Sequence, residues 1–264
     1  MAEWRECRGM EEEFEIYAGF AEVYDEFMDN IPYDEWHLYL HELLMEYGIT
    51  SGIVAELACG TGSMTSRLAE DGYDMIGIDI SEDMLEVARN KCGADVLLLQ
   101  QDMRELDLYG TAAAMVCVCD GMNYITEKEE LKKVFENVKT FLDYDGIFIF
   151  DMKTEHFYKD IIGECVIADN RENASIIWDN KFHEDTRINE YLLTIYNLED
   201  EENDLFARYD EMHYQKAYSI EEVSSLIEEA GLKLLNVYNA FTKDKPDKDS
   251  ERVYFVAKRE RLSK

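Results

Sequence analysis

The chain has 264 residues, and 47% of them are hydrophobic, so it can bury a core and is not a disordered chain. This length suits one domain with an insertion or with a small additional cap. Aspartate and glutamate number 59 against 26 lysines and arginines, for a formal net charge of -33. Such a charge repels phosphate backbones and anionic membranes, so nucleic acid and membranes are poor partners for this acidic protein. We interpret the acidity as a solubility feature or as adaptation to a salty cytoplasm.

The sequence has no apolar segment typical of a signal peptide near its N-terminus. No stretch approaches the roughly 20 apolar residues that a membrane-spanning helix requires. We therefore expect a soluble, cytoplasmic protein that is a monomer or a homodimer.

The cysteines and histidines do not predict a metal site. The six cysteines are scattered and lack the Cys-x-x-Cys pairs of a zinc site, which indicates reduced thiols. His37 and His41 lie one helical turn apart, but no third ligand stands at a suitable spacing. We interpret the two histidines as helix-surface residues and expect no bound metal.

The N-terminal region predicts two amphipathic helices, at residues 12–30 and 34–48, joined at Asn30-Ile31-Pro32. Apolar and aromatic residues recur in the first at spacings of three and four. They are Phe14, Tyr17, Ala18, Ala21, Tyr24 and Phe27. We assign residues 1–49 to an N-terminal helical lid.

Strands and helices alternate in the next part of the chain, which implies a parallel sheet with right-handed crossovers. The predicted strands are 52–57, 74–80, 95–100, 112–118 and 146–151. Ser81 is the expected N-cap of the helix after the second strand. Thr126 and Glu129 fit a capping box before the helix that follows the fourth strand.

The pattern changes after about residue 163 to aromatic and β-branched segments separated by acidic turns. We predict antiparallel strands at 164–170, 174–183, 187–198 and 204–216. A helix returns at Ser219, where Glu222 completes a capping box and Gly231 is the expected C-cap. Two closing strands follow at 232–241 and 251–258. We divide the chain after the lid into a first core part (50–163), an inserted β cap (164–217) and a closing core part (218–264).

The segment from Glu56 to Gly62 joins the first predicted strand to a helix through a Gly-x-Gly turn. Glycine lets the backbone approach a ligand closely, and the helix start presents N–H groups to an anionic group. This pattern predicts a nucleotide-like cofactor. A dinucleotide site would place a third glycine where Thr65 stands, so that fingerprint is incomplete.

The pattern Glu56-x-x-x-Gly60-x-Gly62 resembles the first motif of class I S-adenosylmethionine-dependent methyltransferases. Asp79 ends the second strand, where a carboxylate can accept both ribose hydroxyls, although NAD enzymes also use an acid there. Asp102-Met103 and Cys119-Asp120 follow the third and fourth strands, so the resemblance covers about residues 50–151. Near the N-terminus, Phe20 to Met28 and Pro32 to Trp36 resemble the lid helices of small-molecule methyltransferases in this superfamily.

The resemblance implies an α/β fold. Its core is a Rossmann-like, seven-stranded, mostly parallel sheet with helices on both faces and an antiparallel last strand. The helical lid and the inserted antiparallel β cap complete the expected architecture. The implied cofactor is S-adenosylmethionine, and the product is S-adenosylhomocysteine. The predicted cofactor-binding residues are Tyr24, Tyr33, Glu56, Ala58, Cys59, Gly60, Gly62, Asp79, Ile80, Met84, Gln101, Asp102, Met103, Cys119 and Asp120.

The implied reaction transfers a methyl group to a nitrogen or oxygen atom of a small-molecule acceptor by in-line displacement. In this superfamily the insertion after the fifth strand often covers the acceptor. If a base is needed, His183, His213 and Tyr209 in the insertion are candidates, although each of them fits a half-exposed sheet position better.

Two alternatives remain at this point. A NAD(P)-dependent oxidoreductase is disfavoured by Thr65 and by the lack of a Tyr-x-x-x-Lys pair after the fourth strand. A non-catalytic, cofactor-binding regulatory protein on the same fold is compatible with the sequence.

Overall fold

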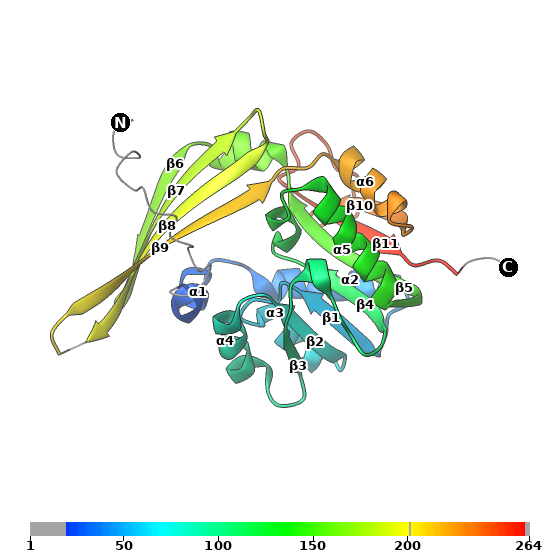
Figure 1. The fold of residues 1–264 in the computed structure, drawn as a ribbon, viewed down its shortest axis with the longest axis horizontal. Coiled ribbons are helices and arrows are strands. Elements are labelled where there is room, and N and C mark those ends of the chain that lie inside the picture. The colour runs from blue at the N-terminus through cyan, green and yellow to red at the C-terminus, as the bar shows by residue number, and fades with distance from the viewer. Residues whose placement is uncertain (1–19, 201, 262–264) are drawn as a thin grey trace.

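The computed structural model of the protein describes residues 20–200 and 202–261. It contains a seven-stranded sheet flanked by helices, and a four-stranded sheet that extends away from it (Figure 1). This arrangement confirms the fold predicted from the sequence. Phe14, Tyr17 and Ala18 of the first predicted helix lie outside the described residues.

The seven-stranded sheet has the strand order β10-β11-β5-β4-β1-β2-β3. Its strands are β1 (Ile53–Leu57), β2 (Asp74–Asp79), β3 (Leu97–Gln100), β4 (Ala112–Cys117), β5 (Leu142–Lys153), β10 (Lys233–Asn239) and β11 (Arg252–Lys258). β1 to β5 pair in parallel, whereas β11 is antiparallel to both β5 and β10. The chain order reverses between β1 and β4, and ligands of open α/β sheets bind where such a reversal meets the carboxyl ends of the strands.

Helices cover both faces of this sheet. They are α2 (Tyr33–Glu46), α3 (Ser63–Glu70), α4 (Glu82–Cys92), α5 (Lys128–Phe141) and α6 (Ile220–Glu229). The apolar stripes of α5 and α6 share one buried cluster with the sheet, and those of α2 and α3 share another. Alternate side chains of β5 show the division, because Phe148 packs towards the first cluster and Ile149 towards the second.

Two of the three predicted N-terminal helix caps are present, and α6 ends with Ala230 as its C-cap, one residue before the predicted Gly231, which has a φ of +84°. The Ser81 hydroxyl accepts a hydrogen bond from the Met84 amide at 3.2 Å, and Ser219 forms a complete capping box with Glu222. The prediction of a capping box at Thr126 was wrong. The Tyr218 hydroxyl donates a hydrogen bond to the Ile125 carbonyl oxygen at 2.9 Å. Glu127 has an extended backbone conformation, and α5 begins at Lys128.

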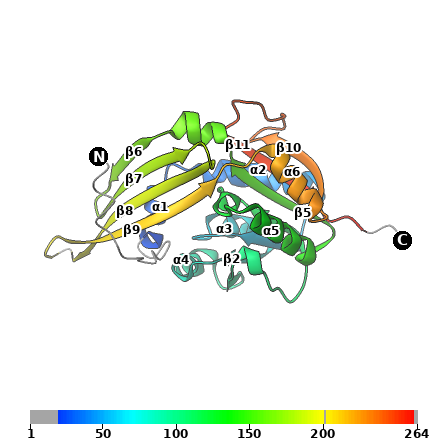
Figure 2. The ribbon, with the colours of Figure 1, turned by 45° about the horizontal axis from the view of Figure 1, so that its top comes forward.

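The inserted segment forms an antiparallel sheet of four consecutive strands, close to the predicted bounds (Figure 2). They are β6 (Cys165–Asn170), β7 (Ala174–His183), β8 (Ile188–Asp200) and β9 (Leu205–Lys216). One face packs against α1 (Ala21–Phe27), where Phe20 and Phe27 contact Ile176 and Ile195 in one buried cluster.

The first N-terminal helix ends earlier than the sequence predicted, at Phe27 rather than at residue 30. The chain turns at Met28 and reaches α2 through Pro32, which has no N–H to continue a helix. No helix within residues 20–200 and 202–261 is long and apolar enough to cross a bilayer.

Candidate active site

A first cavity opens at the carboxyl ends of β1, β2, β3 and β4, where the strand order reverses. Residues that follow these strands form its walls, and Tyr24 and Tyr33 of the N-terminal region close one side. Among the described residues, every predicted cofactor-binding residue except Gly62 and Asp120 lines this cavity. The fold thus brings together side chains that are distant in the sequence.

The glycine loop, from Gly60 to Gly62, forms part of the boundary of this cavity. Gly60 has a φ of +52°, a left-handed conformation that favours glycine, and a Cβ atom added there would meet open space. Gly62, with a φ of +74°, has another role, because an added Cβ would lie 2.5 Å from the Cys92 sulfur and 3.1 Å from the Ala88 Cβ. Gly62 therefore allows the start of α3 to pack closely on α4.

Asp79 stands at the end of β2 with its carboxylate fixed by the backbone. One oxygen accepts a hydrogen bond from the Gly60 amide at 2.8 Å, and the other accepts one from the Ser81 amide at 2.9 Å. Burial raises the pKa of this carboxyl group. A carboxylate has about four acceptor positions, so the remaining two can accept the hydroxyls of a bound ribose.

Glu56 is 2% exposed at the end of β1, and burial raises its pKa to about 8. Its carboxyl group accepts a hydrogen bond from the Thr65 hydroxyl. Thr65, the residue that breaks the dinucleotide fingerprint, is therefore the partner of the first acid in the motif. With this pKa, most Glu56 carboxyl groups are protonated at neutral pH and can donate a hydrogen bond.

Asp102 lines the cavity, but Arg104 of the same short turn binds its carboxylate. The Arg104 Nη2 lies 2.6 Å from Oδ2, and the Arg104 amide donates to Oδ1 at 2.8 Å. Burial alone would raise the pKa of Asp102, and the hydrogen bonds from Arg104 lower it below its usual value. Ile80, Met84 and Met103 form apolar wall beside it.

A second cavity adjoins the first, between the N-terminal helices, the end of β4 and the inserted sheet. Tyr24, Tyr33, Cys119 and Tyr124 line both cavities. The wall of the second cavity is rich in aromatic side chains, including Phe20, Trp36, Phe157, Trp178 and Tyr191.

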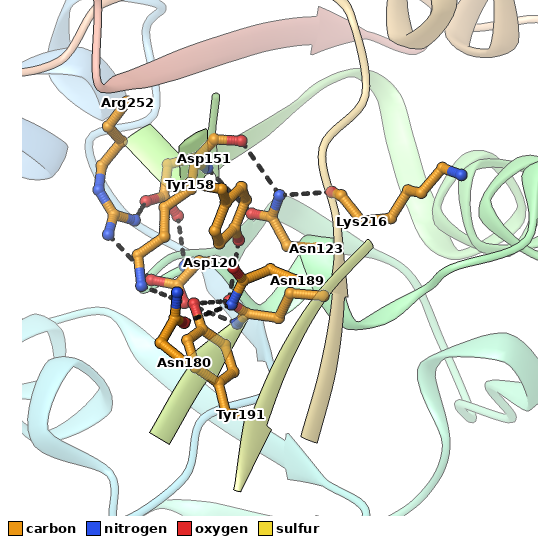
Figure 3. A network of polar contacts seen from close by, with 11 residues as sticks. Asp120, Asn123, Asp151, Tyr158, Asn180, Asn189, Tyr191, Lys216 and Arg252 are labelled. Atoms are coloured by element: carbon orange, nitrogen blue, oxygen red, sulfur yellow. Dashed lines mark hydrogen bonds and ion pairs between the residues drawn. The ribbon is translucent and has the colours of Figure 1, made fainter. Parts of the chain in front are cut away.

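Asp120 lies in this second cavity rather than in the first. Both Cys119 and Asp120 have left-handed backbone conformations, with φ values of +63° and +59°, which turn the chain sharply after β4. The Asp120 carboxylate pairs with Arg252 at 2.9 Å and with Lys153 at 3.2 Å (Figure 3). Burial opposes ionisation, but these two cations hold the pKa of Asp120 below its usual value.

A hydrogen-bond network connects Asp120 to the inserted sheet (Figure 3). Gln215 of β9 donates to the Asp120 carboxylate at 2.8 Å. The Gln215 side-chain oxygen in turn accepts from the hydroxyls of Tyr158, at 2.8 Å, and Tyr191, at 2.9 Å. The network fixes the inserted sheet to the end of β4, so the wall of the second cavity is held in a defined position.

Of the three candidate bases, the structure brings only His213 to a cavity. His213 and Glu211 are each 2% exposed, and their Nε2 and Oε2 atoms lie 3.0 Å apart. His183 instead approaches Glu190 at 3.3 Å, and the Tyr209 hydroxyl donates to Glu199 at 2.9 Å. Neither His183 nor Tyr209 is among the described residues that line the two cavities.

The sequence analysis missed several residues of the first cavity, namely Thr61, Ser63, Met64, Arg104, Val118, Gly121, Tyr124 and Ile125. The first three adjoin Gly60 and Gly62, so proximity to the motif would have found them. The last three belong to or follow a short 3-10 turn, Gly121–Tyr124, that no motif marked.

The sheet order, the glycine loop and the acid after β2 together define the class I methyltransferase fold. Residues 54–146 match the family described as "Methyltransferase domain". The chain is 35% identical over 249 residues to the putative methyltransferase YqeM of Bacillus subtilis (strain 168), across 92% of this chain and 97% of that protein. The chain therefore belongs to the S-adenosylmethionine-dependent methyltransferases.

Solved structures agree with this assignment. The crystal structure of an S-adenosylmethionine-dependent methyltransferase from Clostridium acetobutylicum ATCC 824 has a TM-score of 0.81 at 25% identity, over 93% of this chain and 100% of that chain. CalS10, an amino pentose methyltransferase from Micromonospora echinaspora, has the same fold, with a TM-score of 0.70 at 18% identity over 90% and 96% of the two chains. The resemblance noted in the sequence is thus confirmed, and S-adenosylmethionine is the cofactor.

The residues of the first cavity fit this cofactor. The open space above Gly60 leaves room for its methionine portion, and Asp79 offers two acceptor positions for its ribose. Ile80, Met84 and Met103 give apolar surface suited to its adenine ring.

Proposed function

We propose that this protein methylates a nitrogen or oxygen atom of a small molecule bound in the second cavity. The observation that carries the proposal is the common wall of the two cavities, formed by Tyr24, Tyr33, Cys119 and Tyr124. A nucleophile held in the second cavity can therefore face a cofactor held in the first. S-adenosylmethionine, when bound, supplies a methyl group already activated by its sulfonium. Positioning the nucleophile in line can lower the barrier by roughly 7–11 kcal/mol.

In this proposal the N-terminal helices form a lid over both cavities. Asp25 of α1 pairs with Lys91 of α4 at 2.6 Å and accepts a hydrogen bond from the Thr61 hydroxyl at 2.7 Å. The other side of α1 packs against the inserted sheet through Phe20 and Phe27. A lid held on both sides excludes water from the reacting atoms.

We assign His213 the role of general base for acceptors that lose a proton. His213 lines the second cavity, and its Nε2 lies 3.0 Å from the Glu211 Oε2, which orients the ring. Tyr124, which lines both cavities, lies edge-on to His213 with 5.9 Å between ring centroids. His213 is therefore next to the junction where the acceptor atom has to be placed.

The test uses the purified full-length protein in two steps. Calorimetry should show tighter binding of S-adenosylhomocysteine than of NAD, and tighter binding of NAD would contradict the proposal. The protein is then incubated with S-adenosylmethionine and a small-molecule cell extract, and S-adenosylhomocysteine formation is measured by mass spectrometry. Formation above the level seen without extract supports methyl transfer to a small molecule. Binding without turnover on any extract fraction would favour the non-catalytic regulatory alternative.

A further inference from the structure

Three potential metal ligands meet outside the two cavities, between α2 and the end of α3. His37 and His41 lie one turn apart on α2, and Asp71 is the C-cap residue of α3. The Asp71 Oδ2 atom lies 2.7 Å from His37 Nε2 and 2.7 Å from His41 Nδ1. Sequence spacing gave no third ligand, because Asp71 stands 34 residues from His37 and the packing of α2 on α3 brings it near.

The two ring nitrogens approach the same carboxylate oxygen in different ways. His37 Nε2 forms a hydrogen bond with it. His41 Nδ1 is buried and, within residues 20–200 and 202–261, has no hydrogen-bond partner. A neutral ring nitrogen without a proton repels a carboxylate oxygen at this distance, unless a positive charge lies between them. Either each ring carries its proton on the nitrogen that faces Asp71, or one cation is shared by all three groups.

The ligand set and its spacing favour a first-row divalent metal. Two imidazoles and one carboxylate suit zinc, nickel or cobalt rather than magnesium or calcium, which prefer oxygen ligands. The three ligand atoms lie within 4.8 Å of one another. Zinc bonds of about 2.0–2.2 Å in a tetrahedron separate ligand atoms by about 3.3 Å, so small side-chain rotations would open the site to the ion.

We propose that His37 Nε2, His41 Nδ1 and Asp71 Oδ2 bind one zinc-type divalent ion, with water in the fourth position. The ion has a structural role, because no residue of this cluster is among the described residues that line the two cavities. The partial exposure of the three side chains, 18%, 34% and 23%, gives the ion a path from solvent.

The site connects α2 and the end of α3, two elements that begin beside the cavities. α2 begins with Tyr33, which lines both cavities, and α3 begins directly after the glycine loop. Arg67 of α3 already pairs with Asp34 of α2 at 2.9 Å. The ion would fasten the same two helices at a second point, nearer the end of α3.

The full-length protein, treated with a chelator and dialysed, is titrated with Co²⁺ by visible absorption and with Zn²⁺ by calorimetry. We expect one metal ion to bind per protein chain. The absorption bands of bound Co²⁺ should be typical of nitrogen and oxygen ligands, with no cobalt–thiolate band. His37→Ala, His41→Ala and Asp71→Asn should each lower the affinity at least about 10–100-fold. Asp71→Asn keeps the side-chain shape, and circular dichroism checks that each variant folds.

His156→Ala is the matched control. His156 pairs with Asp160 at 2.9 Å across one helical turn, but it does not belong to the three-ligand cluster, so this variant should bind as the wild type does. Zn²⁺ should also raise the melting temperature of the wild type and of His156→Ala, but not that of His41→Ala. Failure to bind one equivalent, binding that survives all three ligand substitutions, or a cobalt–thiolate band would overturn the proposal. The cluster would then be a histidine–aspartate ion pair only.

Discussion

Replacing Asp79 with alanine tests how the first cavity holds the ribose. Two hydrogen bonds to an ionised acceptor contribute about 1.5–3 kcal/mol each, and losses at one site need not add. The affinity for S-adenosylhomocysteine should therefore fall by about 10-fold for a net loss of about 1.5 kcal/mol, and by more than about 100-fold where the two losses add to about 3 kcal/mol. Stability should fall as well, because the amides of Gly60 and Ser81 lose their acceptor, at about 1 kcal/mol each where water can reach them.

Calorimetric titration with S-adenosylhomocysteine measures the affinity, and urea denaturation measures the stability. Asp74→Ala is the control, because Asp74 lies at the exposed start of the same strand, remote from the cavity. Asp79→Asn separates the two effects, since it retains one acceptor oxygen for a backbone amide but loses the charge. An Asp79→Ala variant that binds S-adenosylhomocysteine as tightly as the wild type would refute the role given to Asp79.

Three further predictions concern single positions. Because the folded-state pKa of Glu56 is about 8, its stabilising contribution is complete at low pH and is lost as the pH rises from about 5 to 8. Glu56→Gln should therefore lessen the decline of unfolding free energy over that range, by up to about 1.4 kcal/mol per pH unit, and a parallel profile would contradict this. Gly62→Ala should lower the free energy of unfolding by about 1–3 kcal/mol in urea denaturation, because the added Cβ clashes with the Cys92 sulfur. Adding Cys92→Ala to this variant should recover part of that loss, and no recovery would show that the clash with Cys92 is not the cause. His213→Asn should lower the methyl-transfer rate by about 10²–10⁴-fold while sparing S-adenosylhomocysteine binding, whereas an unchanged rate, or an equal loss in His183→Asn, would exclude His213 as the base.

Local sequence patterns predicted the elements well, because they reflect local physics. The inserted strands follow from alternation, and β8 shows why, with buried and half-buried residues alternating from Ile188 to Leu198. The glycine loop and Asp79 follow from the backbone demands of a strand–loop–helix turn at a ligand. The capping box at Ser219 is likewise a local arrangement within one helical turn.

The features that the sequence did not reveal depend on tertiary contacts. Asp120 adjoins Cys119 in the sequence, yet the partners that place it in the second cavity, Lys153, Gln215 and Arg252, come from three different strands. The packing role of Gly62 depends on Cys92, a residue of the next helix. No local pattern encodes such pairings, so motif spacing located the first cavity, the family resemblance alone pointed to an acceptor site under the insertion, and the polar network there was not predicted.

The shared wall of the two cavities has a thermodynamic consequence. Tyr24 and Tyr33 line both cavities, so under the proposed function a shift of α1 or α2 on binding one ligand would change the surface offered to the other. Such coupling is reciprocal, since the factor by which one ligand alters the affinity of the second must equal the factor in the opposite direction. Any tightening of acceptor binding by S-adenosylmethionine therefore implies that the acceptor retains the cofactor equally well.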